Sequence, residues 1–342
     1  SERLKHARLE VSEEALRPYF PVPRVLAGLF TVASRLYGIR VVARDDVELY
    51  DPDVRYFDIV DPQGSPLAGF YLDLHARPKK RGGAWMDECV GRIRMGDTSA
   101  LPIAYLVCNF TPPAGERPSL LTHYEVLTLF HEFGHGLHHM LTRVDYPSVA
   151  GINGVPWDAV ELPSQFMENF AWREEVLPLI SAHVDTGEPL PAEVLKRLQA
   201  TRSFQAGMQT VRQLEFALFD FRLHAEYRPG TPPRIAETLA EVREEVAVVT
   251  PPEWNRFAHG FQHIFSGGYA AGYYSYKWAE VLSADAFGAF EEQGVFDPLT
   301  ARRFLHSILE RGGGRDAMDA FVEFRGREPQ IEPLLRQMGL AA

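Results

Sequence analysis

Two histidines and a glutamate near the middle of the chain have the types and the spacing that metal-assisted chemistry requires. His131 and His135 are four residues apart, so on an α-helix their side chains share one face and can bind one ion. Glu132 follows His131 and is turned by about 100° around the helix axis. A carboxylate at that position does not bind the ion, but it lies within hydrogen-bond distance of a water bound to the ion, which is where a general base must be. The pattern is typical of zinc peptidases, although so short a pattern also recurs by chance.

The residues around these histidines predict the helix that the pattern requires. Thr122 to Glu125 fit a capping box, which marks the start of a helix. After it, residues at i, i+3 and i+4 spacing form an apolar, buried stripe that includes both histidines. One histidine in such a stripe would be interpreted as an ordinary core residue. Two at ligand spacing, with a glutamate between them, are much harder to explain in that way.

A metal site needs a third protein ligand, and the sequence offers three candidates. His138 lies seven residues after His131, about 10 Å along a helix axis, which is too far to share a tetrahedral ion. The metzincin pattern, with its third histidine ten residues after the first, is excluded because position 141 is a leucine. The remaining candidate is a carboxylate from a second helix. We therefore predict Glu161, in the segment 158–169, as the third ligand.

The same segments resemble a known family. The pattern H-E-F-G-H-x-x-H, followed further along the chain by D-x-V-E-x-P-S-Q-x-x-E-N, resembles the thimet oligopeptidase and oligopeptidase A family of zinc metallopeptidases. Segment 263–276 resembles its Gly- and Tyr-rich substrate-binding loop, and 17–21 and 83–86 are similar to the bacterial oligopeptidase A branch. Members of the family are much longer. The 342 residues match only their C-terminal, catalytic half.

The residue types then predict a mechanism. Two neutral imidazoles and a carboxylate hold one Zn²⁺ per chain and leave a fourth position for water, whose pKa the ion lowers. Glu132 takes the proton as this water attacks a peptide carbonyl and delivers it to the leaving amine. Asp158 and Glu168 lie on roughly the face of Glu161 and are predicted to accept hydrogen bonds from the metal-bound histidines. The alternative for Glu168 is a solvated surface acid.

Three tyrosines near residue 270 have two interpretations. Tyr269, Tyr273 and Tyr276 fall at i, i+4 and i+7, which by itself fits an aromatic stripe in a helix core. The family resemblance instead implies that they and His263 bind the substrate or stabilise the developing oxyanion, with Tyr273 and Tyr276 nearest the reacting carbonyl. Glycines in the same segment allow the backbone to approach a ligand closely. These glycines are Gly267, Gly268 and Gly272.

Composition narrows the classes of partner and location. The chain has 35 basic and 46 acidic residues, a net charge of −11, and no basic run suited to a phosphate backbone, so we expect no nucleic-acid partner. It has neither an apolar run of about eighteen residues nor an apolar leader, so we expect no membrane or secretory role. The two cysteines, Cys89 and Cys108, are too few for a disulfide framework and fit a reducing, cytoplasmic location.

The arrangement of the predicted elements indicates a mainly α fold, a single catalytic domain over residues 1–342. Residues 1–37 are predicted as a helical lead-in, 38–110 as a small antiparallel β-sheet, and 119–342 as a helical region with the zinc site. Strand 103–110, which leads to the metal helix, is either an edge strand that binds an extended peptide through its backbone or an ordinary core strand.

Together these inferences predict a zinc-dependent endopeptidase that hydrolyses short oligopeptides. Two alternatives stay open: a non-catalytic, partner-dependent peptide-binding fragment of such an enzyme, and a zinc hydrolase with a non-peptide substrate. The intact Glu132 argues against a decayed enzyme. Because the resemblance implies two lobes around a channel, an isolated lobe would expose apolar surface. Three hypotheses follow: a homo-oligomer, a separate N-terminal lobe as a partner, or a shallower cleft with looser selection of substrate size. We favour a partner or an oligomer, because open apolar walls are costly to keep in solution.

Overall fold

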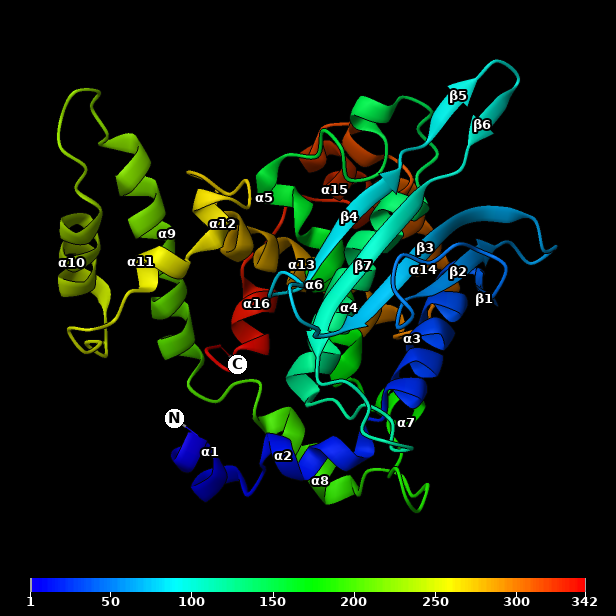
Figure 1. The fold of residues 1–342 in the computed structure, drawn as a ribbon, viewed down its shortest axis with the longest axis horizontal. Helices are drawn as coiled ribbons and strands as arrows, with labels where there is room; N and C mark the ends of the chain where they lie inside the picture. The colour runs from blue at the N-terminus through cyan, green and yellow to red at the C-terminus, as the bar shows by residue number, and fades with distance from the viewer. Residues whose placement is uncertain (1, 342) are drawn as a thin grey trace.

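The computed structural model describes residues 2–341, which form a mainly helical structure around one small sheet (Figure 1). Residues 1 and 342, the ends of the predicted single domain, lie outside the described part. The chain begins with short helices that lead to α3, which ends at Gly38 in the left-handed conformation. These elements are α1 (Glu2–Leu9), α2 (Glu13–Leu16), η1 (Arg17–Tyr19) and α3 (Val22–Tyr37).

The sheet has five strands in the order β1-β2-β3-β7-β4. Their bounds are β1 (Arg40–Arg44), β2 (Arg55–Val60), β3 (Pro66–His75), β4 (Trp85–Val90) and β7 (Ile103–Phe110). A separate hairpin of β5 (Ile93–Met95) and β6 (Thr98–Ala100) extends beyond the sheet, at the upper right of Figure 1.

One detail of the predicted sheet is wrong. The sheet is mixed, not antiparallel, because β7 pairs parallel to β3. Of the two alternatives for strand 103–110, the structure shows the core strand, because β3 and β4 pair with β7 on either side. In the sequence β4 and the hairpin come before β7, but in the sheet β7 lies between β3 and β4. Strand order of this kind depends on contacts between distant segments, which side-chain alternation does not encode.

Alternation along β3 shows how the sheet joins the helices. Phe70 is fully buried and meets Phe30 of α3 and Phe133 of α4, at ring-centroid distances of 6.2 and 5.8 Å. The next residue, Tyr71, points to the opposite face and stacks on Tyr105 of β7. One face of the sheet therefore forms the main core with α3 and α4 (His123–Met140). Helix α4 begins with the predicted capping box at Thr122.

The remainder of the chain is helical. Its elements are η2 (Pro147–Val149), α5 (Trp157–Val160), α6 (Leu162–Glu168), η3 (Asn169–Trp172), α7 (Leu177–Ile180), α8 (Ala192–Ala200), α9 (Ala206–Ala225), α10 (Ile235–Val246), α11 (Phe257–Gly260), α12 (Gln262–Phe265), α13 (Ser275–Gln293), α14 (Pro298–Phe304), η4 (Leu305–Leu309), η5 (Gly312–Gly314), α15 (Ala317–Arg325) and α16 (Glu332–Gln337). No helix among the described residues is long and apolar enough to cross a membrane.

A second, smaller core joins α9 to the helices that follow it. Phe216 and Phe219 of α9 pack with Phe261 and Tyr273 in a cluster separate from the main core. Figure 1 shows α9, α10 and α11 on the left, with α5, α6 and α13 between them and the sheet. The segment that precedes α13 is therefore placed between the two cores.

Helices α4 and α6 approach each other closely at Gly134. A Cβ atom on Gly134 would lie 2.5 Å from the carbonyl oxygen of Pro163 and 2.6 Å from Cα of Ser164. Both distances are far below van der Waals contact, and both neighbours are backbone atoms that cannot turn aside. Only glycine therefore permits this approach.

The first prediction concerns this contact. Gly134→Ala should lower the free energy of unfolding by about 1–3 kcal/mol, the usual cost of overpacking a core, as measured by urea unfolding. Gly207→Ala is the matched control, because Gly207 lies in exposed α9 backbone where an added Cβ meets no atom within 4 Å. The control should show no loss of stability. Equal unfolding midpoints for both variants would contradict a tight contact at Gly134.

Candidate metal and active site

Helix α4 and the junction of α5 with α6 bring three metal-ligand side chains together. His131 and His135 lie on one face of α4, and Glu161 is the single residue between α5 and α6. The Nε2 atoms of both histidines lie 3.1 Å from Oε2 of Glu161. The three ligand atoms all lie within 4.8 Å of one another. These are the residues that the sequence predicts as ligands.

The geometry of this cluster fits a small divalent ion. Ligand atoms about 2.0–2.1 Å from a tetrahedral zinc ion lie about 3.3 Å apart. The 3.1 Å between Glu161 Oε2 and each histidine Nε2 is close to that value. Burial raises the pKa of Glu161, but the two histidines outweigh this and hold that pKa well below its usual value. The carboxylate, only 1% exposed, therefore stays ionised, which is the form that binds a metal. His138, also on α4, is not part of the cluster.

Neighbouring side chains orient the ligands. His131 Nδ1 donates to Glu168 Oε1 at 2.6 Å, which directs Nε2 of the same ring towards Glu161. Ser164 Oγ donates to Glu161 Oε2 at 2.9 Å. Asp158 does not take part: its half-buried side chain makes no hydrogen bond or ion pair within residues 2–341. The helix is interrupted at Glu161, so the face that the sequence predicts for Asp158 and Glu168 does not continue through it.

Glu132 lies next to the cluster and lines the same cavity. It is 6% exposed, and burial raises the pKa of its carboxyl above the usual value. A raised pKa makes a carboxylate a better proton acceptor near neutral pH. The geometry thus places a potential base beside the metal-ligand cluster without making it a ligand.

The tyrosine segment is not the continuous helix that the spacing of its aromatic residues suggests. Tyr269 lies in an irregular stretch and Tyr273 in a turn, and α13 begins only at Ser275, so Tyr276 alone of the three is helical. The Tyr269 hydroxyl donates to Glu161 Oε1, and its ring stacks on Tyr276 with centroids 4.9 Å apart. Trp157 covers Tyr269 from another side, at 4.4 Å.

Tyr273 points away from the metal-ligand cluster. Its hydroxyl donates to Oε1 of Gln213 on α9 at 3.0 Å, and its ring packs in the second core. The reason is a buried carboxylate: Asp220 of α9 accepts hydrogen bonds from the backbone N–H groups of Ala271 and Tyr273, each at 2.9 Å. Ala271 has a φ of 56°, a conformation that L-residues rarely adopt. Asp220 therefore stabilises a strained turn that directs Tyr273 towards α9.

The cluster opens into a cavity of about 800 Å³. His263, Gly267, Tyr269 and Tyr276 line it, whereas Tyr273 does not. Gly268, with a φ of 86°, and Gly272 pack over Trp157, where an added Cβ would lie 3.4 and 3.7 Å from the indole. The other wall is formed by residues 81–87, which include the start of β4.

Comparison with known proteins identifies the family. The model of peptidase family M3 matches residues 1–340. The chain belongs to peptidase family M3. Among curated M3 relatives, oligopeptidase A of Escherichia coli (strain K12) is 57% identical over 341 residues, which cover 99% of this chain and 50% of the relative. Dipeptidyl carboxypeptidase of Salmonella typhimurium is 38% identical, with coverage of 99% and 50%. The chain thus spans about half the length of the curated relatives that it matches.

Solved structures support the same fold for this M3 chain. PZ peptidase A with an inhibitor aligns with a TM-score of 0.53 at 15% identity, covering 99% of this chain and 60% of that one. Pyrococcus furiosus carboxypeptidase aligns with a TM-score of 0.56 at 15% identity, covering 95% and 59%. At such identities the likeness concerns the fold alone.

Sequence reasoning missed several residues that shape the site. The contact of Ser164 with Glu161 could have been predicted, because Ser164 follows Glu161 by three residues in the motif D-x-V-E-x-P-S-Q-x-x-E-N. Trp157, Gln213 and Asp220 carried no such signal, because their contacts join segments that are far apart in the sequence.

The second prediction tests the support of His131. Glu168→Ala should weaken zinc affinity by about 10–100-fold, because the ring loses the acceptor that orients it. Asp158→Ala is the matched control and should bind zinc like the parent, since its carboxylate contacts neither histidine. Zinc affinity is measured by competition with a chromogenic chelator. Loss of affinity in the Asp158 variant, with none in the Glu168 variant, would reverse the assignment.

Proposed function

We propose that this chain is the catalytic part of a zinc-dependent endopeptidase that acts on short oligopeptides. The observation that carries the proposal is the convergence of His131, His135 and Glu161 at one point of a large cavity, with Glu132 beside them. Oligopeptidase A relatives with high identity over the whole chain support the same substrate class. Because the chain spans only about half of these relatives, the activity of the complete protein is part of the proposal.

The side chains have distinct roles in the proposed reaction. One Zn²⁺ held by the three ligands supplies Lewis acidity, which lowers the pKa of water and polarises a carbonyl. Glu132 accepts the proton of the attacking water and transfers it to the leaving amine. Burial, followed by the charge of Glu161, raises the pKa of Tyr276, so its hydroxyl stays protonated and is able to donate to the developing oxyanion. His263 lines the same cavity and is a second candidate donor.

The wall of the cavity offers a place for an extended peptide. Strand β4 pairs with β7 along one side only, and its residues Trp85, Met86 and Asp87 line the cavity. We propose that β4, which is the edge strand beside β7, binds the substrate backbone by edge pairing. The guanidinium of Arg81 lies over the Trp85 ring, 5.3 Å from its centroid, and adds a positive charge to this wall.

We also propose a binding partner and a cellular location for this chain. Exposed aromatic and apolar side chains on α9 and around the start of α13 fit contact with a separate N-terminal lobe or a second copy. They include Leu214, Phe221, Tyr274 and Trp278. Both cysteines, Cys89 and Cys108, are free thiols, in accord with the reducing, cytoplasmic location that we propose.

The third prediction tests the general base. Glu132→Gln should keep zinc and fold but lower turnover of a quenched fluorescent peptide at least about 100-fold, because an amide cannot accept the proton of the water. Chelator treatment of the parent should abolish the same activity, and added zinc should restore it. Activity within a few-fold of the parent would exclude this role. A zinc-loaded parent that never cleaves the peptide would favour a binding fragment or a different substrate.

The fourth prediction separates the tyrosines. Tyr276→Phe should lower kcat more than it raises KM, because its hydroxyl is needed mainly in the transition state. Tyr273→Phe should change kcat by no more than a few-fold, since that hydroxyl donates to Gln213 and lies outside the cavity. Steady-state kinetics on one peptide compares the two variants. A large loss of kcat in the Tyr273 variant alone would restore the role that the family resemblance implies for it.

A further inference from the structure

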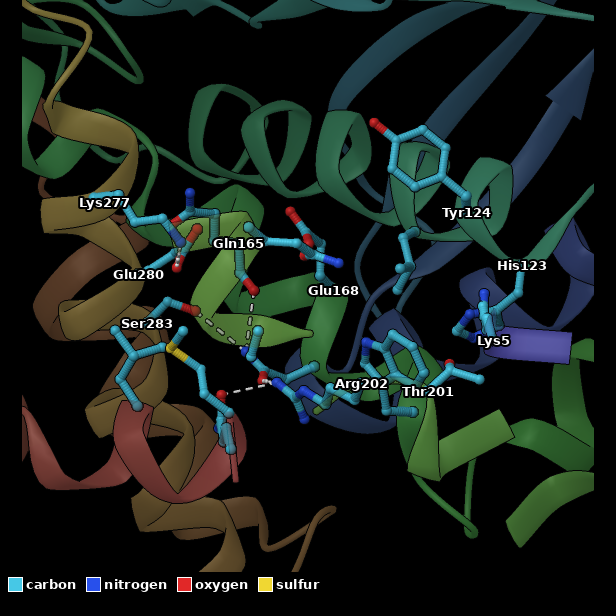
Figure 2. A pocket seen from close by; sticks show the side chains of 18 of the residues that line it. Lys5, His123, Tyr124, Gln165, Glu168, Thr201, Arg202, Lys277, Glu280 and Ser283 are labelled. Atoms are coloured by element: carbon cyan, nitrogen blue, oxygen red, sulfur yellow. Dashed lines mark hydrogen bonds and ion pairs between the residues drawn. The ribbon is translucent and has the colours of Figure 1, made fainter. Parts of the chain in front are cut away.

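A second cavity, of about 380 Å³, lies next to the catalytic one, and no residue lines both. Figure 2 shows side chains from α4, α6 and α13 around it. Two of them form hydrogen bonds to residues of the catalytic cavity. Glu168 accepts the hydrogen bond of His131, and the side-chain amide of Gln165 donates to the backbone carbonyl of Tyr276 at 3.0 Å. A molecule in this cavity would therefore contact residues that hold the active site in place.

Two buried side-chain atoms of this cavity have no hydrogen-bond partner among the described residues. Gln165 is only 8% exposed, and because its Nε2 donates to Tyr276, the unpaired atom Oε1 must be an acceptor. Gln337 accepts from Arg202 through Oε1, at 2.8 Å, so its unpaired Nε2 must be a donor. Buried polar atoms of proteins are nearly always paired, so these two indicate an absent ligand or water.

Charged groups of both signs line the cavity, and two pairs of them form ion pairs, Lys5 with Glu13 and Lys277 with Glu280. Arg202 bonds Asn169 and Gln337 through Nη2, and within residues 2–341 it forms no ion pair with a carboxylate. Burial lowers the pKa of Arg202 to about 10, which shows that its charge is poorly solvated. No described residue accepts a hydrogen bond from its Nε or Nη1, so each of these N–H groups can donate to a carboxylate. On another side of the cavity lie Glu168 and Glu280 (Figure 2).

One carboxylate oxygen of Glu280 accepts no hydrogen bond from a described residue. Lys277 donates to Oε2 of Glu280 at 2.6 Å, and no described residue donates to Oε1. Burial raises the pKa of Glu280, because it disfavours the ionised carboxylate. A cation bound beside Glu280 would stabilise that ionised form. Apolar surface completes the cavity and comes from Leu127, Trp172 and Met338.

We infer that this cavity is a binding site for a small zwitterion, an α-amino acid or a dipeptide with an apolar side chain. Its carboxylate binds Arg202 and Nε2 of Gln337, and its ammonium group binds Oε1 of Gln165 together with the carboxylates of Glu168 and Glu280. Both unpaired atoms then gain partners of the correct kind. The site is separate from the proposed catalytic one, and its occupancy depends neither on zinc nor on peptide hydrolysis.

Calorimetry on the chelator-treated full chain tests the inference, with L-phenylalanine and glycyl-L-phenylalanine as probes. At least one probe should bind with one site per chain. Two analogues should bind at least about tenfold more weakly, 3-phenylpropionate because it lacks the ammonium group and 2-phenylethylamine because it lacks the carboxylate. If neither zwitterion binds, or if an analogue binds equally well, the inference is overturned.

Variants locate the bound probe. Gln337→Glu places a carboxylate beside Arg202, so it should weaken binding at least about tenfold by occupying the guanidinium. Arg336→Gln, an exposed neighbour on α16, is the matched control and should bind like the parent. Circular dichroism and thermal unfolding check the fold. Arg202→Lys, which removes the Nε and Nη1 donors but keeps the charge, replaces Gln337→Glu if that variant is unfolded. Undiminished binding to a folded variant would overturn the site. Because no step uses zinc or substrate, this result is independent of the Glu132→Gln experiment.

Discussion

The contact between α4 and α6 at Gly134 is the constraint on which the rest of the site depends. It lets the backbone of Pro163 and Ser164 lie against α4 at a distance that any Cβ would prevent. Glu161, just before Pro163, is thereby placed 3.1 Å from both histidine Nε2 atoms. A shift of this contact by the size of one methyl group would separate the ligands, because metal–ligand distances tolerate only a few tenths of an ångström.

The carboxylate of Glu161 also connects the two cores. It accepts hydrogen bonds from Ser164 of α6 and from Tyr269, on the segment that precedes α13. That segment is held on its other side by Asp220 of α9. The position of Tyr269 against the metal-ligand cluster thus depends on the packing of α9, and a movement of the second core would be transmitted to the ligand. The aromatic residues of the segment are fixed by these polar contacts as much as by burial.

Helix α6 has different surroundings on its two sides. Glu161, at its start, faces the catalytic cavity, whereas Gln165 and Glu168 line the second cavity. The residue just before this short helix is thus a candidate metal ligand, and the helix itself carries the acceptor for His131 and the donor to the backbone of Tyr276. Polar groups so close to a metal-ligand cluster are expected to influence its orientation even when they do not contact the ion.

The sequence by itself determined the local part of this structure. The capping box at Thr122 and the apolar stripe behind it define α4, and the spacing of His131 and His135 then fixes their common face, because both features depend only on neighbouring residues. Glu161 could also be predicted as the third ligand, because it is a carboxylate in a recognisable motif. Only the tertiary structure decided that β7 lies between β3 and β4, that Glu168 meets His131 while Asp158 does not, and that Tyr273 turns towards α9. These outcomes depend on contacts between segments far apart in the chain, which local periodicity does not specify.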